Sequence, residues 1–312
     1  MAAKRIPHDE GRRPGVHERI PHGEGRRPAS AKRIPLRRFL ALYGIYAKMD
    51  LMWFLRDSKY ALLGILGDAV SNLTAVAGIF LLAWRFDGVG GMTRYEVLFM
   101  LGYTTLITGV FQTFFASNNT GHISRRIGRG QIDHMLIQPL PLPVHLLAEG
   151  FIPFTGSSNL VTGSLILAAS IHLMKIALPW WWLFSLIGNI AVTMLIILSE
   201  SYLYSSVAFY APAAAEEISY YVIDLRSPLS QYPLSGMPLQ LQIPLITAVP
   251  AGLLAWFPTM ALLGKPPLNL SSFFPLLIAI LFFLLAQFTF RKGMMHYVKT
   301  GSSRYLTQGY RR

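Results

Sequence analysis

Long apolar runs alternate with short polar segments over most of this chain. A membrane-spanning helix needs about 20 apolar residues, and six stretches approach or exceed that length. They lie at residues 60–84, 97–116, 144–173, 180–210, 239–263 and 273–290. The third contains Pro153 and Gly156, and the fifth contains three prolines, so we expect the fifth to be kinked or broken and the third to be irregular. The pattern predicts an all-α polytopic membrane protein with a six-helix domain over residues 59–292.

The first 58 residues show two other patterns. Residues 1–35 repeat a basic, Pro- and Gly-rich unit with a period of fourteen, and we expect them to be disordered. This tail either touches anionic lipid headgroups or has no role. In residues 36–58, apolar and aromatic side chains recur at three- and four-residue spacing among basic ones, which predicts an amphipathic helix in the membrane interface. The side chains concerned are Phe39, Tyr43, Tyr46, Met49 and Trp53.

Composition supports a membrane protein. Hydrophobic residues make up 53% of the chain and charged residues only 14%, whereas a soluble domain carries about 25% charged residues. The net charge of +13 does not require a nucleic-acid partner. If the N-terminus is cytoplasmic, all but four of the 28 Lys and Arg residues lie in cytoplasmic segments, including Arg226 in an expected loop between the fourth and fifth spans. The positive-inside rule then places both termini in the cytoplasm and residues 293–312 in a cytoplasmic tail.

The segment 117–143, between the second and third spans, is polar but patterned. Ile123 and Ile127 are four residues apart, and Ile132, Met135 and Leu136 repeat the helical spacing. We expect two short amphipathic helices joined by a hinge at 128–130 and ended by prolines, which then hold the chain extended. The prolines are Pro139, Pro141 and Pro143. The loop either sets topology alone or docks another protein, and three arginines could form forked hydrogen bonds with a partner's carboxylates. These are Arg125, Arg126 and Arg129.

This segment resembles a known family. The pattern Gly130-x-x-Asp133-x-x-Leu136-x-x-Pro139, followed by a helix ending at Glu149, is similar to the cytoplasmic loop of type-2 ABC exporter permeases, in particular the six-span permeases of bacterial drug-type exporters. Residues 232–238, 249–264 and 290–305 carry further matching stretches in the same order. The resemblance covers about residues 37–305 and leaves out the repeat tail and the final residues.

The resemblance implies a permease that pairs with a copy or a relative in the bacterial inner membrane and binds two ATPase subunits. ATP and Mg would lie on those subunits, with no cofactor on this chain, in which Gly264-Lys265 is followed by Pro266 and forms no phosphate-binding loop. The loop would enter a groove of the ATPase. The residues expected to couple the two proteins are Ile123, Arg125, Arg126, Ile127, Arg129, Asp133, Leu136 and Pro139.

Two carboxylates fall inside apolar spans, Asp68 in the first and Glu200 in the fourth. A carboxylate near the middle of a membrane costs about 2.5–3.5 kcal/mol on insertion scales, so both should face protein or water. Glu200 either contacts a cationic cargo or gate, or is held by neighbouring hydroxyls. Aromatic rings at the end of the second span either line a cargo path or pack between helices. These are Phe111, Phe114 and Phe115.

No pattern of catalytic residues is evident, and His122 and His134 are too far apart for a helical metal pair. The absence of cysteine excludes disulfides and thiolate metal sites. We expect a transport subunit rather than an enzyme, contacting lipid and a small amphipathic or hydrophobic cargo such as a drug, dye or toxic cation, with the cargo class taken from the resemblance. The alternatives are a lipid or glycan exporter, a polytopic membrane enzyme, or a sensor that moves nothing.

Overall fold

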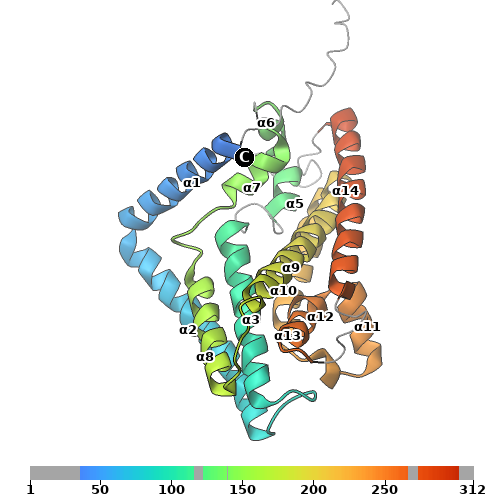
Figure 1. The fold of residues 1–312 in the computed structure, drawn as a ribbon. Coiled ribbons are helices and arrows are strands. Elements are labelled where there is room, and N and C mark those ends of the chain that lie inside the picture. The colour runs from blue at the N-terminus through green and yellow to red at the C-terminus, as the bar shows by residue number, and fades with distance from the viewer. Residues whose placement is uncertain (1–35, 116–121, 139, 266–272, 302–312) are drawn as a thin grey trace, which may run out of the picture. The chain divides into compact units, whose positions relative to one another are not determined.

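The computed structural model describes residues 36–115, 122–138, 140–265 and 273–301. All regular elements in these ranges are helices, apart from one isolated β-bridge between Val89 and Met92, so the all-α prediction is confirmed there (Figure 1). The helices are α1 (Leu36–Arg56), α2 (Ser58–Arg85), α3 (Arg94–Phe114), α5 (His122–Gly128), α6 (Ile132–Leu136), α7 (Leu142–Glu149), α8 (Ser158–Met174), α9 (Trp182–Ser205), η1 (Ser206–Phe209), α10 (Pro212–Leu229), η2 (Leu234–Gly236), α11 (Leu239–Thr247), α12 (Ala251–Leu254), α13 (Trp256–Leu262) and α14 (Phe274–Thr300).

Among the described residues, four helices are long and apolar enough to cross a membrane. The number of candidate spans rises to five if the bent pair α11 and α12–α13 is counted as one span. The four are α2, α3, α9 continued by η1, and α14, and they correspond to the predicted first, second, fourth and sixth spans. The predicted helix over residues 36–58 is present as α1. The sixth helix is longer than predicted, because α14 continues without a break through residue 292 to Thr300.

The predicted third span, 144–173, is not one helix. α7 ends at Glu149 and α8 begins at Ser158. Pro153 cannot donate a backbone hydrogen bond to a helix there. Asp50 of α1 instead accepts hydrogen bonds from the backbone N–H groups of Phe154 and Thr155, at 2.7 and 3.2 Å, and so stabilises the non-helical connection. Pro143 also differs from its predicted role, since it lies in the first turn of α7, where a missing N–H has no cost.

α8 packs closely along α3. A side chain at Gly109 would overlap the backbone of Leu160, and one at Gly163 would overlap the backbone of Leu106, so the two helices run antiparallel with their backbones nearly in contact. α3 is accordingly the most enclosed of the four long apolar helices: 72% of its most apolar 18-residue stretch is buried, against 11% for α2. Its buried Tyr103 lies within hydrogen-bonding distance of Thr193 in α9, at 3.3 Å.

The region after α9 departs most from the sequence prediction. Residues 211–238 were expected to form a loop, but α10 occupies most of them. The predicted fifth span at 239–263 is broken as expected, with a bend of 69° between α11 and α12–α13. Both ends of this bent pair lie at one end of the helix bundle. Ser235, just before α11, donates a hydrogen bond to the carbonyl of Gly90 in the α2–α3 turn, and Leu262 at the end of α13 accepts one from Trp182 at the start of α9 (3.1 Å).

Candidate functional site

The two short helices predicted in the 117–143 loop are present as α5 and α6, joined at Gly130, whose φ of 69° favours glycine. Their apolar faces, however, are covered by the chain itself. Ile123, Ile127 and Ile132 are buried in one cluster with Phe209 of η1 and Tyr297 of α14. Ile123 and Ile127 are thus covered by their own chain, and their role in coupling to an ATPase stays a prediction. The cover comes from the unforeseen length of α14, whose last three turns pack against the loop.

Asp133 has an internal role as well. The hydroxyl of Tyr297 donates a hydrogen bond to its carboxylate, at 2.8 Å, so that α6 is held to the end of α14. A hydrogen bond to a charged group contributes about 1.5–3 kcal/mol. The loop is thus joined to the last long helix both by apolar packing and by this contact, and a force on the loop would be transmitted to α14.

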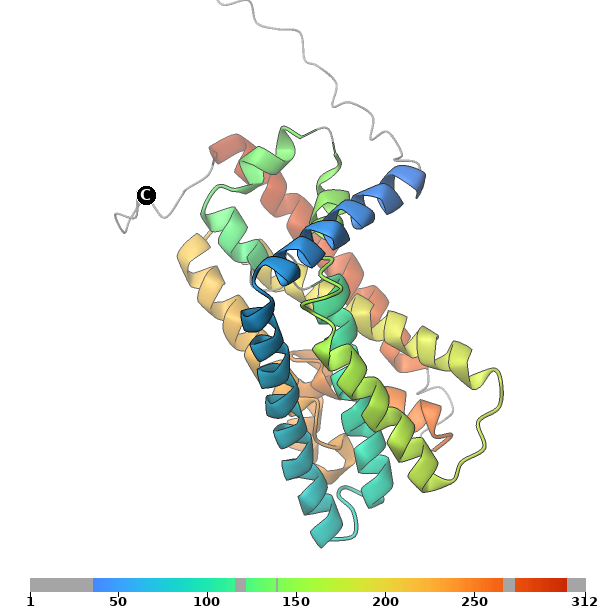
Figure 2. The same cartoon turned by 90° about the vertical axis from the view of Figure 1, so that its left-hand side faces the viewer.

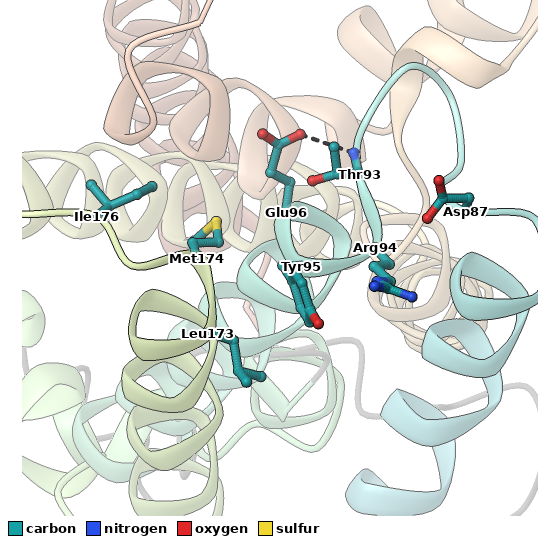
Figure 3. Close-up of a pocket in the computed structure, with 8 residues that line it drawn as sticks. All are labelled: Asp87, Thr93, Arg94, Tyr95, Glu96, Leu173, Met174 and Ile176. Atoms are coloured by element: carbon teal, nitrogen blue, oxygen red, sulfur yellow. Dashed lines mark hydrogen bonds between the residues drawn. The ribbon is translucent and has the colours of Figure 1, made fainter.

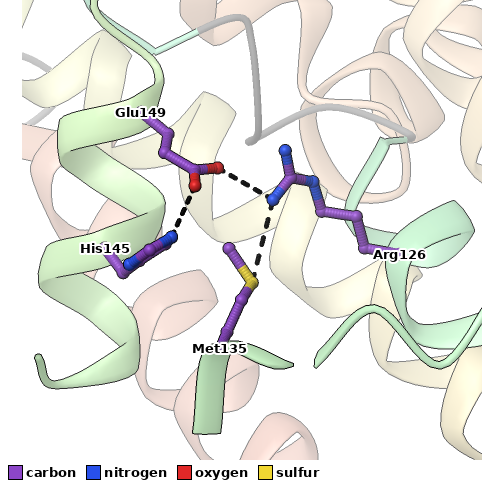
Figure 4. Close-up of polar contacts among 4 residues, drawn as sticks. All are labelled: Arg126, Met135, His145 and Glu149. Carbon is purple, nitrogen blue, oxygen red and sulfur yellow. Dashed lines mark hydrogen bonds and ion pairs between the residues drawn. The ribbon is translucent and has the colours of Figure 1, made fainter. Parts of the chain in front are cut away.

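A second polar group joins α5, α6 and α7 (Figure 4). Arg126 lies 2.8 Å from one carboxylate oxygen of Glu149 and 3.7 Å from the sulfur of Met135, and His145 lies 2.5 Å from the other carboxylate oxygen of Glu149. The side chains of Arg126 and Glu149 are 25% and 22% exposed. Arg126, predicted to bind a partner, is therefore held by its own chain. The contact between Arg126 and Glu149 could not be recognised from sequence, because the two residues are 23 positions apart.

The outer surface of the loop retains the predicted character. Arg125 and Arg129 are exposed, and Leu136 is 45% exposed. Ile137, which the sequence analysis did not single out, is 82% exposed directly after Leu136. Its exposure could have been recognised from sequence, since Ile137 breaks the three- and four-residue spacing of the buried residues before it. Pro139 lies outside the described residues. The loop thus presents two basic and two apolar side chains, and we call these four residues the loop surface.

The surroundings of Glu200 are formed by this chain's own residues. Glu200 is completely buried, and Arg226 of α10 donates a hydrogen bond to its carboxylate at 3.0 Å. The two side chains are 1% and 8% exposed. The guanidinium of Arg226 also lies 6.0 Å from the centre of the Phe111 ring. Arg226 was missed because its segment was expected to be a cytoplasmic loop, although a lone arginine 26 residues after an intramembrane glutamate could have suggested the pair.

Of the other predicted path residues, Phe111 lies beside the Glu200–Arg226 pair, whereas Asp68, Phe114 and Phe115 have other surroundings. Asp68 is exposed on α2. The ring of Phe115 packs on Phe111 and Phe114, and Phe114 stacks on Phe151, with centroids 5.4 Å apart. These aromatics thus pack against one another and against the α7–α8 connection, and a part in a cargo path stays a prediction.

A cavity of about 470 Å³ lies at the opposite end of the bundle, between the start of α3 and the end of α8 (Figure 3). Two of its charged groups, Glu96 and Arg94, have partners within the chain. Glu96 lies 2.6 Å from Lys265 and accepts a hydrogen bond from the backbone of Thr93 in a capping box. Arg94 stacks on Trp84, 4.4 Å from the ring centre. Among the described residues, no group of three or more His, Asp or Glu residues is arranged to hold a metal ion.

Comparison with protein families agrees with this architecture. Residues 70–301 match the model of a family described as ABC-2 family transporter protein, and this match covers most of the chain. Comparisons with curated proteins and with solved structures each gave no match. The chain belongs to the ABC-2 transporter family and is a multi-pass membrane permease without an ATPase domain.

Proposed function

Since the chain is an ABC-2 permease, we propose that it forms the membrane half of an ATP-driven exporter of small amphipathic or hydrophobic compounds. The carrying observation is the attachment of the α5–α6 loop to α14 through Tyr297 and Asp133. A motor subunit that displaced the loop would move α14 with it. ATP and Mg are expected on two separate ATPase subunits, and the loop surface is the part of this chain that would contact them.

The contacts support a topology of six crossings by α2, α3, α8, α9 with η1, α10 and α14. α10 begins directly after η1 and is followed by Ser235, which contacts the α2–α3 turn at the other end of the bundle. The bent pair α11 and α12–α13 then enters and leaves on one side. α10 is too polar to pass as a span by composition, and its Arg226 is accommodated by Glu200. Both termini lie in the cytoplasm of a bacterial inner membrane in this proposal, as the distribution of basic residues favours.

We further propose that α2 contacts a second permease, either a copy or a relative. Small and polar residues lie along one exposed stripe of this helix, at spacings of three, four and seven. The stripe consists of Gly64, Gly67, Asp68, Ser71 and Gly78. Small residues allow helices to approach closely in a membrane, and a carboxylate there requires protein or water around it. A partner helix on this stripe would meet both conditions.

The coupling proposal is tested by a double substitution on the loop surface, Arg129→Glu with Ile137→Glu. Both side chains are exposed and neither carries the contacts to α14 or α7. We expect normal membrane insertion but loss of co-purification with an ATP-hydrolysing subunit from the native membrane. The matched control is Lys299→Glu with Val298→Glu, a basic and an apolar exposed residue near the end of α14. Retention of the ATPase by the loop variant, at the wild-type level, would refute this docking surface.

Orientation has a separate test, which the lack of cysteine makes simple. Single substitutions Ile137→Cys and Trp180→Cys place one thiol at each proposed face, and both positions are at least 80% exposed. In intact cells, a membrane-impermeant maleimide should label Trp180→Cys alone. Labelling of Ile137→Cys under the same conditions would contradict the cytoplasmic location of the loop.

A further inference from the structure

A second pocket, of about 340 Å³, lies between α1 and the connection from α7 to α8. Figure 2 shows the course of α1 across this side of the bundle. The α1 wall follows the helical spacing i, i+3, i+4, i+7. It consists of Tyr46, Met49, Asp50 and Trp53. The facing wall is formed by Glu149, Phe151, Ile152 and Thr155. None of these residues belongs to the loop surface, to the Asp133–Tyr297 contact or to the stripe on α2. The pocket shares Glu149 with the polar group of Arg126 and His145 and is otherwise separate from the sites described above.

Asp50 supplies a fixed negative charge in this pocket. Its carboxylate accepts three hydrogen bonds, from the backbone of Phe154, the backbone of Thr155 and the hydroxyl of Thr155. All three donors are uncharged. Among the described residues, no Lys, Arg or His forms an ion pair with Asp50. The residue is nevertheless buried, with 8% of its surface exposed. The geometry orients the carboxylate but leaves its charge uncompensated.

Three aromatic residues line the same pocket as Asp50. Tyr46 and Trp53 lie four residues before and three residues after Asp50, and Phe151 belongs to the facing wall. Trp53 is 49% exposed, so part of its ring is available at the rim. The faces of such rings attract cations, most strongly for tryptophan. The negative surroundings also act on Tyr46, whose pKa is raised by burial and further by Glu149, with Arg126 opposing.

The chemistry of the pocket thus combines the carboxylate of Asp50, that of Glu149, which is paired with Arg126, three rings and an apolar rim that includes Met49, which is 54% exposed. α1 carries exposed apolar side chains beside Arg37, Arg38 and Lys48, as expected of a helix at the membrane interface. A pocket on such a helix opens at the depth of lipid headgroups. A ligand with a positive head and an apolar tail fits both parts of this environment.

We propose that this pocket binds the cationic headgroup of an amphiphile, with Asp50 as counter-ion and Trp53 against the cation. The head is an alkylammonium group, which either a cargo molecule or an amine-headed lipid can supply. The proposal rests on the proposed function only for the location of α1 at the membrane interface. Binding is a property of this chain alone and can be measured without any ATPase, so failure here and failure of the coupling proposal are distinguishable.

The experiment uses the full chain purified in dodecyl maltoside and titrated with dodecyltrimethylammonium, with bound copies counted by native mass spectrometry. We expect saturable binding that Trp53→Leu weakens by about tenfold, the effect of a cation–ring contact of ordinary strength. Asp50→Asn should weaken binding at least as much. The matched control is Trp180→Leu, which removes an exposed tryptophan far from the pocket in sequence and should bind as the wild type does.

The head and the tail are separated by competitors. Dodecyl sulfate has the same tail and the opposite charge, and it should not displace the probe. Phosphatidylethanolamine displaces the probe if the site accepts a lipid amine and leaves it bound if the site selects cargo amphiphiles, and both results agree with a cation site. Displacement of the probe by phosphatidylglycerol as strong as that by phosphatidylethanolamine would contradict a cation site. Wild-type affinity in Trp53→Leu would overturn the proposal, and because Trp53 is half exposed, this variant is expected to fold even if Asp50→Asn does not.

Discussion

The two carboxylates that lie in apolar helices, Glu200 in α9 and Asp68 in α2, have opposite surroundings. Glu200 is completely buried and paired with Arg226 at 3.0 Å. Asp68 lies ten residues into α2, is exposed, and forms no ion pair within the described part of the chain. Both would cost free energy in lipid, but only Glu200 is compensated by its own chain.

The difference separates an interior whose charges are paired within the chain from a surface on α2 whose charge is not paired by the described residues. Around Glu200, three elements meet: α9 carries the carboxylate, α10 the guanidinium and α3 the ring of Phe111. Around Asp68, the neighbours on the same face are small, and added side chains at Gly64, Gly67 and Gly78 would meet no atom within 4 Å. The interior is complete in one chain, whereas the stripe on α2 has room for a partner helix.

The largest effect is expected from removing the cation of the interior pair. Arg226→Met would leave Glu200 buried and unpaired, which typically costs about 3–5 kcal/mol. We expect this loss in the free energy of unfolding of the purified chain, measured by denaturant titration in detergent micelles. Adding Glu200→Gln should restore most of it, because a neutral amide carries a smaller desolvation cost.

The matched control for this prediction is Arg129→Met, which removes an exposed arginine from the loop surface and should change unfolding by less than about 0.5 kcal/mol. If Arg226→Met were no less stable than the wild type, the pair would not hold α9 and α10 together. The comparison between the two carboxylates would then lose its basis.

A smaller effect is expected at the exposed carboxylate. Asp68→Leu should leave the stability of the single chain unchanged or slightly raised, because an unpaired charge is removed from an apolar helix. Self-association should weaken by about 1 kcal/mol, in the range of interhelical polar contacts in membranes. Energy transfer between labelled chains in liposomes measures it. Ser164→Leu, at another exposed polar position on α8, is the control. Association of Asp68→Leu at the wild-type strength would place the second permease elsewhere.

The helices that could be predicted from sequence are those whose apolar length is self-evident. α2, α3 and α9 follow from composition alone, α5 follows from the spacing of Ile123 and Ile127, and α6 from that of Ile132, Met135 and Leu136. The end of α14 could not be predicted in this way. After Phe290 its sequence becomes basic and polar, yet Gly293 packs on Phe209 and Tyr297 binds Asp133, so tertiary contacts extend the helix.

The same cause limits what the sequence could say about the contacts of single residues. The spacing of Ile123 and Ile127 showed that they share an apolar face, but not which protein covers it. Arg226 looked like part of a loop because its helix is polar on average, and only its contact with Glu200 makes that helix compatible with the bundle. Periodicity identifies a face, whereas its partner depends on residues far away in sequence.

The smallest effect is expected from adding one methyl group to the stripe. It is also the most sensitive test of how closely a partner helix approaches α2. Gly67→Ala adds a side chain where the chain itself has open space, so it should not destabilise the single chain and, as in other helices, could only favour it by up to about 1 kcal/mol. If a second permease packs closely on the stripe, however, the methyl group should separate the helices and weaken self-association, by less than Asp68→Leu does. Gly188→Ala on α9 also meets open space and is the matched control. Weaker association in Gly67→Ala but not in Gly188→Ala would locate the partner's backbone against α2, because a lipid chain would yield to a methyl group and a packed helix would not.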